Sequence, residues 1–200
     1  MDEQLGRAQE LRLIPPRPAG SVDATGLESS YVSRYFLRRQ EGRCKRQRPW
    51  LKLSLVCEHR SHLIFGLALG RGPGNDATHF PEVVRQSARR LRLDTLFGDA
   101  AYDAEPFHVL GREELGIRLT VFPVNTRNST SPVRHGRYRR QMERHFPRRR
   151  YGQRWQIESV VSQVKRCLRP ELRARSEGGR EREACLKVLT HNFMLLKRCA

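Results

Sequence analysis

The stretch WLKLSLVCEHRSHLIFGLALG, residues 50–70, decides the fold that the sequence predicts. Its first part, Trp50–Glu58, alternates between apolar and polar side chains, which is typical of a β-strand with one buried face. Its second part, His62–Gly70, is apolar throughout, which indicates a central strand and the hairpin partner of the first. The sequence therefore predicts an antiparallel pair of strands at the centre of a sheet.

The elements around this hairpin predict a mixed α/β fold. A short strand around Gly20–Ala24 precedes it, which makes an antiparallel meander of three strands. Helices and strands then alternate, as they do when parallel strands are added with helices on the sheet faces. We expect a helix from a Thr78 cap to Leu91, a strand over Leu93–Gly98, a helix over Ala104–Leu115, a strand over Ile117–Val124, and helices over 151–168 and about 180–197. This order matches the ribonuclease-H-like plan, a mixed sheet flanked by helices.

The remaining segments are predicted to be connections. Residues 1–18 end in a proline-rich stretch and are expected to form a lead-in or linker before a single domain over 19–200. Residues 31–49 carry a basic cluster, expected to be a partly helical or irregular connection. Residues 125–150 are dense in arginine and are expected to form a basic loop over the active face, before the helix that begins at 151.

Composition predicts a polyanionic partner. Lys and Arg number 39 against 21 Asp and Glu, a formal net charge of +18, and nucleic acid is the usual partner for such a surplus, although a merely basic protein has the same composition. The five cysteines form no CxxC pair, which favours free thiols in a reducing cytoplasm. No apolar run approaches the roughly 20 residues of a membrane span, so no membrane partner is expected.

Four residues of YGQRWQIESVVSQVKR, residues 151–166, fall on one stripe of the predicted helix. At about 100° per residue, Tyr151, Arg154, Glu158 and Lys165 project at roughly 0°, 300°, 340° and 320°. The apolar residues of the helix lie on a separate, adjoining arc. The stripe is therefore expected at the rim of the core, facing a cleft.

Three carboxylates stand where a metal-dependent nuclease needs them. Asp23 lies on or just after the first strand, Asp99 ends the strand over Leu93–Gly98, and Glu158 lies on the stripe. If those two strands are neighbours, the aspartates converge, and three carboxylates can hold two divalent ions that activate phosphodiester chemistry. A turn at Asp23, a helix cap at Asp99 and an i,i+4 ion pair between Glu158 and Arg154 explain each residue equally well.

The chain resembles the DDE transposases of bacterial insertion sequences. Tyr151, Arg154, Glu158 and Lys165 match the Tyr-(2)-Arg-(3)-Glu-(6)-Lys signature, and the segments VDATGL, GDAAYD and ACLKVLTHNFMLL resemble the two aspartate segments and the closing helix, with its pair His191 and Asn192.

This resemblance implies a ribonuclease-H-like core that cuts and joins DNA with Mg²⁺ or Mn²⁺. Asp23, Asp99 and Glu158 are the implied catalytic residues and metal ligands. It also implies that Tyr151, Arg154 and Lys165 touch DNA phosphates, and the basic loop with Arg148, Arg149 and Arg150 is expected to bind DNA as well. Transposon ends and target DNA are the implied partners, a homodimer the commonly observed assembly, and the bacterial cytoplasm at the nucleoid the expected location.

Two alternatives stay open from the sequence. Only 22 residues precede Asp23, where family members usually carry a DNA-binding segment, so the chain is also compatible with a catalytically silent, DNA-binding remnant. A metal-dependent nuclease of the same fold, without strand transfer, is the other alternative. Among the remaining residues, Lys52 is expected on a solvated face, Asp76 in a turn, and His191 in a hydrogen bond within the last helix.

Overall fold

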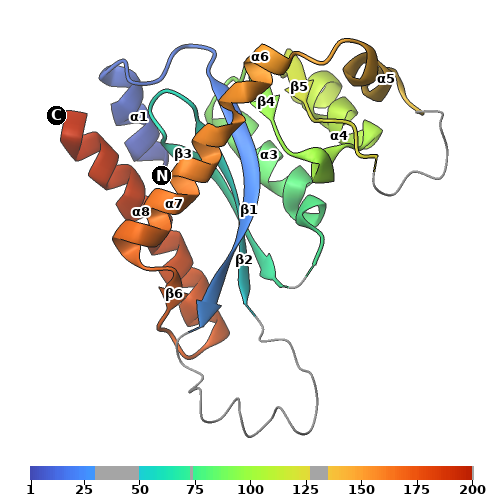
Figure 1. The fold of residues 1–200 in the computed structure, drawn as a ribbon. Coiled ribbons are helices and arrows are strands. Elements are labelled where there is room, and N and C mark those ends of the chain that lie inside the picture. The colour runs from blue at the N-terminus through green and yellow to red at the C-terminus, as the bar shows by residue number, and fades with distance from the viewer. Residues whose placement is uncertain (30–49, 73, 127–134, 200) are drawn as a thin grey trace, which may run out of the picture.

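A six-stranded mixed sheet forms the centre of the molecule, as the computed structural model shows over residues 1–29, 50–72, 74–126 and 135–199 (Figure 1). The strand order is β3-β2-β1-β4-β5, with β6 paired to the far end of β1. The strands are β1 (Ala19–Ser29), β2 (Leu51–Glu58), β3 (Ile64–Arg71), β4 (Thr95–Phe97), β5 (Leu119–Val121) and β6 (Glu171–Leu172). The first three are antiparallel, and β4, β5 and β6 add in parallel. The predicted ribonuclease-H-like α/β plan is confirmed.

The first strand is longer than its sequence predicts, because β2 pairs with it from Gly20 to Leu27. Beyond the short β4, whose last partner pair is Ser21 with Phe97, β1 continues without a parallel neighbour until β6 meets it at Glu28. One edge of β1 therefore borders a gap between β4 and β6, and this gap is the place where the candidate site lies.

Helices cover both faces of the sheet. On one face, α1 (Asp2–Glu10), α3 (Phe80–Arg90) and α4 (Glu105–Val109) contribute to a core that includes Val22 and Val56. On the other face, α7 (Trp155–Leu168) and α8 (Glu177–Cys199) pack on Leu27, Leu53 and Leu55. Figure 1 shows α7 crossing in front of β1. Alternate residues of β2 and β3 thus point to one of these two apolar cores. A third, smaller cluster contains Phe97 of β4, Val121 of β5 and Met142 of α5.

Several local predictions need correction. Thr78 does not cap a helix: it lies inside the short 3-10 turn η1 (Asp76–His79), which Asn75 caps by accepting a hydrogen bond from the amide of Ala77. The predicted helix over Ala104–Leu115 is α4 followed by a π-turn, η3 (Leu110–Glu114). The arginine-dense segment is partly helical, with α5 (Arg137–Arg144) and α6 (Arg148–Tyr151). The predictions for residues 31–49 and for 127–134 lie outside the described residues.

The expected N-terminal lead-in forms helix α1, which packs against the core. Leu5 and Ala8 are buried in the same core as Phe65, and the Gln4 amide donates to the carbonyl of Leu189 in α8 (3.0 Å). These residues are therefore in contact with the domain that follows. The domain boundary at residue 18 stays a prediction.

The last helix is tied to the edge strand by polar side chains. The Asn192 side chain accepts from the amide of Ile64 (2.9 Å) and donates to its carbonyl (2.7 Å), as a neighbouring strand would. His191 bonds the carbonyl of His62 (3.2 Å), so the prediction of a bond within the helix is wrong. Asn192 thus satisfies the backbone of an edge strand, which would otherwise be open to further pairing.

Two contacts fix the position of α7 over β1. At its C-terminus, Lys187 of α8 donates to the carbonyls of Leu168 (2.6 Å), Arg169 (2.9 Å) and Glu171 (3.0 Å). Near its N-terminus, Gln156 bonds the His62 ring at the turn of the β2–β3 hairpin (2.5 Å). A helix held at both ends presents its side chains to the gap beside β1 in a defined orientation.

Candidate active site

The two aspartates lie at the same level on neighbouring parallel strands. Ser21 of β1 is the partner of Phe97 of β4, and Asp23 and Asp99 each follow two residues later. Asp23 continues β1, whereas Asp99 follows the end of β4 and caps the 3-10 turn η2 (Ala100–Tyr102) through the amide of Ala101 (2.9 Å). The predicted neighbourhood of these strands is confirmed, and the cap that the sequence left open for Asp99 is formed as well.

Arg154 joins two of the three predicted carboxylates. It ends the 3-10 turn η4 (Gly152–Arg154), directly before α7. Its Nη2 donates to Glu158 Oε1 at 2.7 Å, and its Nη1 lies 3.6 Å from Asp23 Oδ2. The Arg154 side chain is 19% exposed, while that of Glu158 is 59% exposed. The guanidinium is therefore more deeply buried than the carboxylate that it binds. The i,i+4 ion pair expected as an alternative for Glu158 is therefore present.

The acids of the site affect the pKa values of Asp23 and Tyr151. Burial raises the pKa of Asp23, and the charges of Asp99 and Asp76 raise it further, whereas the amide of Ala24 and Arg154 lower it. Burial also raises the pKa of Tyr151, with Asp99 and Glu158 adding to the effect and Arg154 opposing it. Two aspartates, a glutamate and a tyrosine from four segments thus share one electrostatic environment around a single guanidinium.

The rest of the stripe follows the helix away from this point. Ile157, Val160 and Val164 are buried against the sheet. Lys165 is half-buried on the border of that apolar face, seven residues after Glu158, which corresponds to about 10 Å along a helix axis. The predicted single helix over 151–168 is wrong in its first turn, because the segment is divided into α6, η4 and α7. Tyr151 ends α6 and Arg154 ends η4, so only Glu158 and Lys165 of the predicted stripe lie on α7.

The three arginines of α6 differ in their surroundings. The Arg150 guanidinium donates to Thr95 Oγ1 (2.7 Å) and Asp94 Oδ2 (3.3 Å), which ties α6 to the start of β4. Hydrogen bonds from Arg118 are the main cause that holds the pKa of Asp94 well below its usual range, and Arg150 contributes. Arg148 and Arg149 are exposed. All three side chains are exposed, but Arg148 and Arg149 can meet a ligand without giving up a hydrogen bond to the described part of the chain.

Sequence reasoning missed the position of Lys52, whereas the turn expected at Asp76 is formed. Lys52 is buried, so its expected solvated position is wrong: its Nζ bonds Asp76 Oδ1 (2.7 Å) and the carbonyl of Gly74. Asp76 lies in η1, close enough to Asp23 and Tyr102 to affect the pKa of both. No local pattern marks Lys52, because the residues that bury and bind it, Gly74 and Asp76, lie more than 20 residues away in the chain.

The donor set of the site fits a hard divalent ion, but the site is not closed around one. Carboxylate oxygens are the ligands that Mg²⁺ and Mn²⁺ prefer. Within the described ranges, no three acidic, histidine or cysteine side chains gather closely enough to hold an ion. Arg154 instead lies between Asp23 and Glu158 as the local cation. Asp23 also keeps acceptor capacity, because its only hydrogen bond in this part of the chain comes from the adjacent amide of Ala24.

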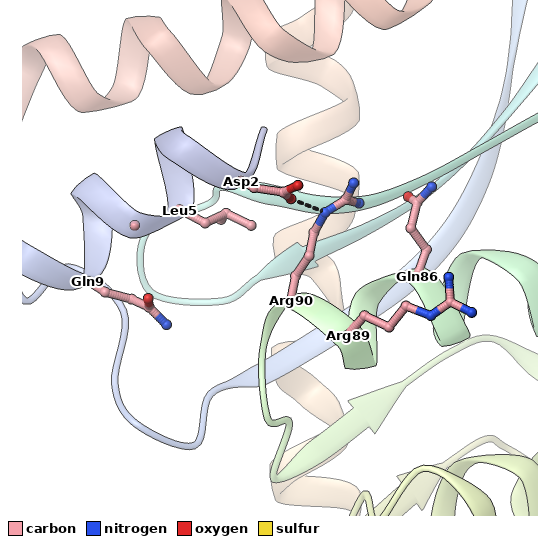
Figure 2. Close-up of a pocket in the computed structure, with 7 residues that line it drawn as sticks. Asp2, Leu5, Gln9, Gln86, Arg89 and Arg90 are labelled. Atoms are coloured by element: carbon pink, nitrogen blue, oxygen red, sulfur yellow. Dashed lines mark hydrogen bonds and ion pairs between the residues drawn. The ribbon is translucent and has the colours of Figure 1, made fainter.

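A separate hollow lies between α1 and α3 and plays no part in this site. It measures about 470 Å³ and is lined by Leu5, Gln86 and Arg89 among others. Figure 2 shows the Asp2 carboxylate directed at the Arg90 guanidinium across it (2.6 Å). The residues that line it belong to α1 and α3, so the hollow results from the way α1 packs beside α3.

The sheet order, the helices on both faces and the acids beside β1 and after β4 define a ribonuclease-H-like domain with a carboxylate-lined gap. The chain belongs to the transposase DDE domain family, whose model matches residues 14–193. Members of this family generally act on DNA as nucleases or transposases and use divalent metal ions. None of the curated proteins matches the chain. No helix in the described part of the chain is long and apolar enough to cross a membrane.

Proposed function

We propose that this chain cuts DNA at the ends of an insertion sequence and joins the freed ends to target DNA. The proposal is supported by two observations within a chain of the DDE family: Asp23 and Asp99 lie at the same level beside neighbouring strands, and Arg154 lies between Asp23 and Glu158. Asp23, Asp99 and Glu158 would hold Mg²⁺ or Mn²⁺, and these ions activate the attacking oxygen and steady the leaving oxygen of a phosphodiester.

The reaction that this site supports has two steps. Water attacks the phosphorus at a transposon end, the bond from phosphorus to the 3′ oxygen breaks, and that oxygen takes up a proton to become a 3′-hydroxyl. The 3′-hydroxyl then attacks a phosphorus of target DNA and loses its proton to solvent. The bond from that phosphorus to the target's own 3′ oxygen breaks, and this oxygen takes up a proton from solvent to become a 3′-hydroxyl. Each step exchanges one phosphorus–oxygen bond for another, so no oxidant or energy source is needed.

The basic residues of the site have separate tasks in this proposal. Arg154 exchanges Glu158 for a DNA phosphate, which its planar guanidinium can grip with two hydrogen bonds. Lys165, about 10 Å further along α7, supplies a point charge for a neighbouring phosphate. Tyr151, on the other side of Arg154, contacts a DNA phosphate as well. Arg148 and Arg149 extend the positive surface along α6, and Arg150 joins them if it leaves Asp94. A homodimer on paired DNA ends, in the bacterial cytoplasm at the nucleoid, is part of the same proposal.

Cleavage of labelled DNA that carries the element's terminal inverted repeats tests the function. With Mg²⁺, the wild-type protein is expected to release cut strands and to join them to a target duplex. Glu158→Gln is expected to lower cleavage by about 10³-fold, because losing several kcal/mol of transition-state stabilisation has this effect on a rate. Glu177→Gln is the matched control, since Glu177 also forms an exposed ion pair, with Arg71, but on α8.

Each outcome of this assay separates the proposal from its alternatives. Cut strands without joined products indicate a metal-dependent nuclease. Salt-sensitive DNA binding with no cut strands in Mg²⁺ or Mn²⁺ indicates a silent DNA-binding remnant. A Glu158→Gln protein that cleaves as fast as the Glu177→Gln control contradicts the role given to Glu158.

A further inference from the structure

Arg154 contacts two of the three acids of the site at once. Its Nη2 donates to Glu158 Oε1 at 2.7 Å, and its Nη1 lies 3.6 Å from Asp23 Oδ2. A positive charge therefore already lies between two carboxylates that are proposed to hold a divalent ion. The guanidinium and the ion cannot share this position, because like charges a few ångströms apart repel each other strongly in a partly buried site.

The contact of Arg154 with Asp23 is incomplete. A separation of 3.6 Å is too long for a hydrogen bond, and Nη1 is buried without a hydrogen-bond partner among the described residues. An unpaired buried donor lowers stability, so the guanidinium gains by meeting an acceptor that satisfies both of its terminal nitrogens. A DNA phosphate is such an acceptor, since it can bind a guanidinium through two parallel hydrogen bonds.

The contact of Arg154 with Glu158 is complete but easily exchanged. The Glu158 side chain is 59% exposed, and an ion pair with so exposed a partner contributes little to stability. Asp23 accepts one hydrogen bond in the described part of the chain, from the amide of Ala24. Both carboxylates can therefore accept another cation once the guanidinium has moved away.

We propose that Arg154 is a placeholder cation, which binds Asp23 and Glu158 in the DNA-free protein and gives them up to a divalent ion when a DNA phosphate binds the guanidinium. The inference rests on the proposed function, in which the two acids are metal ligands. DNA and the metal ion then bind with positive coupling, so each raises the affinity of the protein for the other by the same factor. The protein thus binds its metal ion weakly until its substrate is present.

Mn²⁺ binding by the whole chain, followed by electron paramagnetic resonance of the free ion, tests the competition. Arg154→Gln removes the positive charge from between the two acids. Without DNA, this variant is expected to bind Mn²⁺ about tenfold more tightly than the wild type, a factor typical of coupled sites.

Arg166→Gln is the matched control, because it removes the same charge from the same helix. Arg166 is exposed on α7 and lies about 12 Å beyond Glu158 along the helix axis. At an ionic strength of about 0.15 M, its charge is largely screened over that distance. Arg166→Gln should therefore bind Mn²⁺ with the affinity of the wild type.

The same measurement with a short DNA duplex at saturating concentration tests the exchange, after subtraction of the Mn²⁺ that the duplex binds alone. The duplex should tighten Mn²⁺ binding by the wild type about tenfold, because it draws Arg154 away from the acids. It should change the affinity of Arg154→Gln by no more than about twofold, since this variant has no guanidinium to move. A residue that merely adds positive charge near the site would leave the effect of DNA the same in both proteins.

Four results would contradict the inference. An Arg154→Gln protein that binds Mn²⁺ within about twofold of the wild type without DNA overturns it and leaves the proposed function intact. Equal tightening in Arg166→Gln overturns it too, because charge alone then explains the effect. A duplex that changes Mn²⁺ affinity by the same factor in the wild type and in Arg154→Gln excludes the exchange. Failure of both proteins to bind Mn²⁺, with and without DNA, overturns the proposed function together with the inference.

A measurement on the wild-type protein covers the case in which Arg154→Gln does not fold. The ¹⁵Nε resonance of Arg154 should shift when Mg²⁺ saturates the site, because the guanidinium leaves the two acids. A resonance that does not move at saturating Mg²⁺ overturns the inference.

Discussion

Two aspartates, Asp23 within β1 and Asp103 directly after η2, are held in opposite ways. Asp103 has no exposed side-chain surface: both of its oxygens bind the Arg139 guanidinium (2.9 and 2.8 Å), and one also accepts from the amide of Asn125 (2.8 Å). Asp23 has one bond from its adjacent amide and a guanidinium at 3.6 Å. A carboxylate whose two oxygens accept hydrogen bonds from other segments holds those segments together. A carboxylate with few hydrogen bonds from the protein can accept them from a ligand.

The two aspartates also differ in the segments that they connect. Asp103 and Arg139 tie η2 to α5, so the arginine-rich region after β5 is anchored to the end of β4. Among the described residues, Asp23 forms a hydrogen bond only with its own strand, through the amide of Ala24. Within the segment GDAAYD, Asp99 therefore caps η2, whereas Asp103 connects η2 to α5.

Removing the structural aspartate is expected to have the largest effect. Asp103→Ala leaves Arg139, which is 20% exposed, without its partner, and breaking such a buried pair typically costs about 3–5 kcal/mol of unfolding free energy. Urea unfolding measures the loss. Glu177→Ala breaks the exposed pair with Arg71 and should cost about 1 kcal/mol or less. Equal losses in the two variants would show that Asp103 is not an anchor.

The exposed arginines of α6 should give an intermediate effect, on DNA rather than on folding. Arg148→Ala combined with Arg149→Ala is expected to weaken non-specific DNA binding by roughly tenfold and to lower the salt slope of log K by about 2, since two phosphate contacts are lost. Fluorescence anisotropy across a salt series measures both quantities. Arg85→Ala on α3, where Arg85 pairs with Glu114, is the control that should leave the slope unchanged. A slope unchanged in the double variant would exclude α6 from the DNA surface.

The smallest expected effect concerns stability at the site itself. The folded-state pKa of Asp23 is raised, so the ionised side chain lowers stability above that pKa, and the penalty disappears below the unfolded value near 3.8. Asp23→Asn should therefore melt at a slightly higher temperature than the wild type at pH 7, and the difference should shrink as the pH falls towards 4. A variant that is less stable than the wild type at pH 7 would place Asp23 with Asp103 among the structural residues.

The sequence predicts the sheet better than it predicts the contacts of the site. Alternation in Trp50–Glu58 and the apolar run after it identify the hairpin, because burial of one or both faces leaves a periodic trace. The level placement of Asp23 and Asp99 follows from parallel neighbours. The length of β1 does not, because it depends on pairing with β2 across residues 20–27.

Other features depend on distant partners that no local pattern records. Lys52 looks like a solvated lysine until Asp76 and Gly74 are brought over it. Arg154 is recognisable as a helix neighbour of Glu158, but its approach to Asp23 needs the crossing of α7 over β1.

Mg²⁺-dependent cleavage of terminal-repeat DNA by Asp23→Asn, measured beside the wild type, tests the central claim most directly. The claim is that Asp23 has few hydrogen-bond partners because it is a catalytic residue. It predicts a folded Asp23→Asn protein that binds DNA as the wild type does and cleaves it at least about 10³-fold more slowly. A folded Asp23→Asn protein that cleaves at the wild-type rate would contradict it.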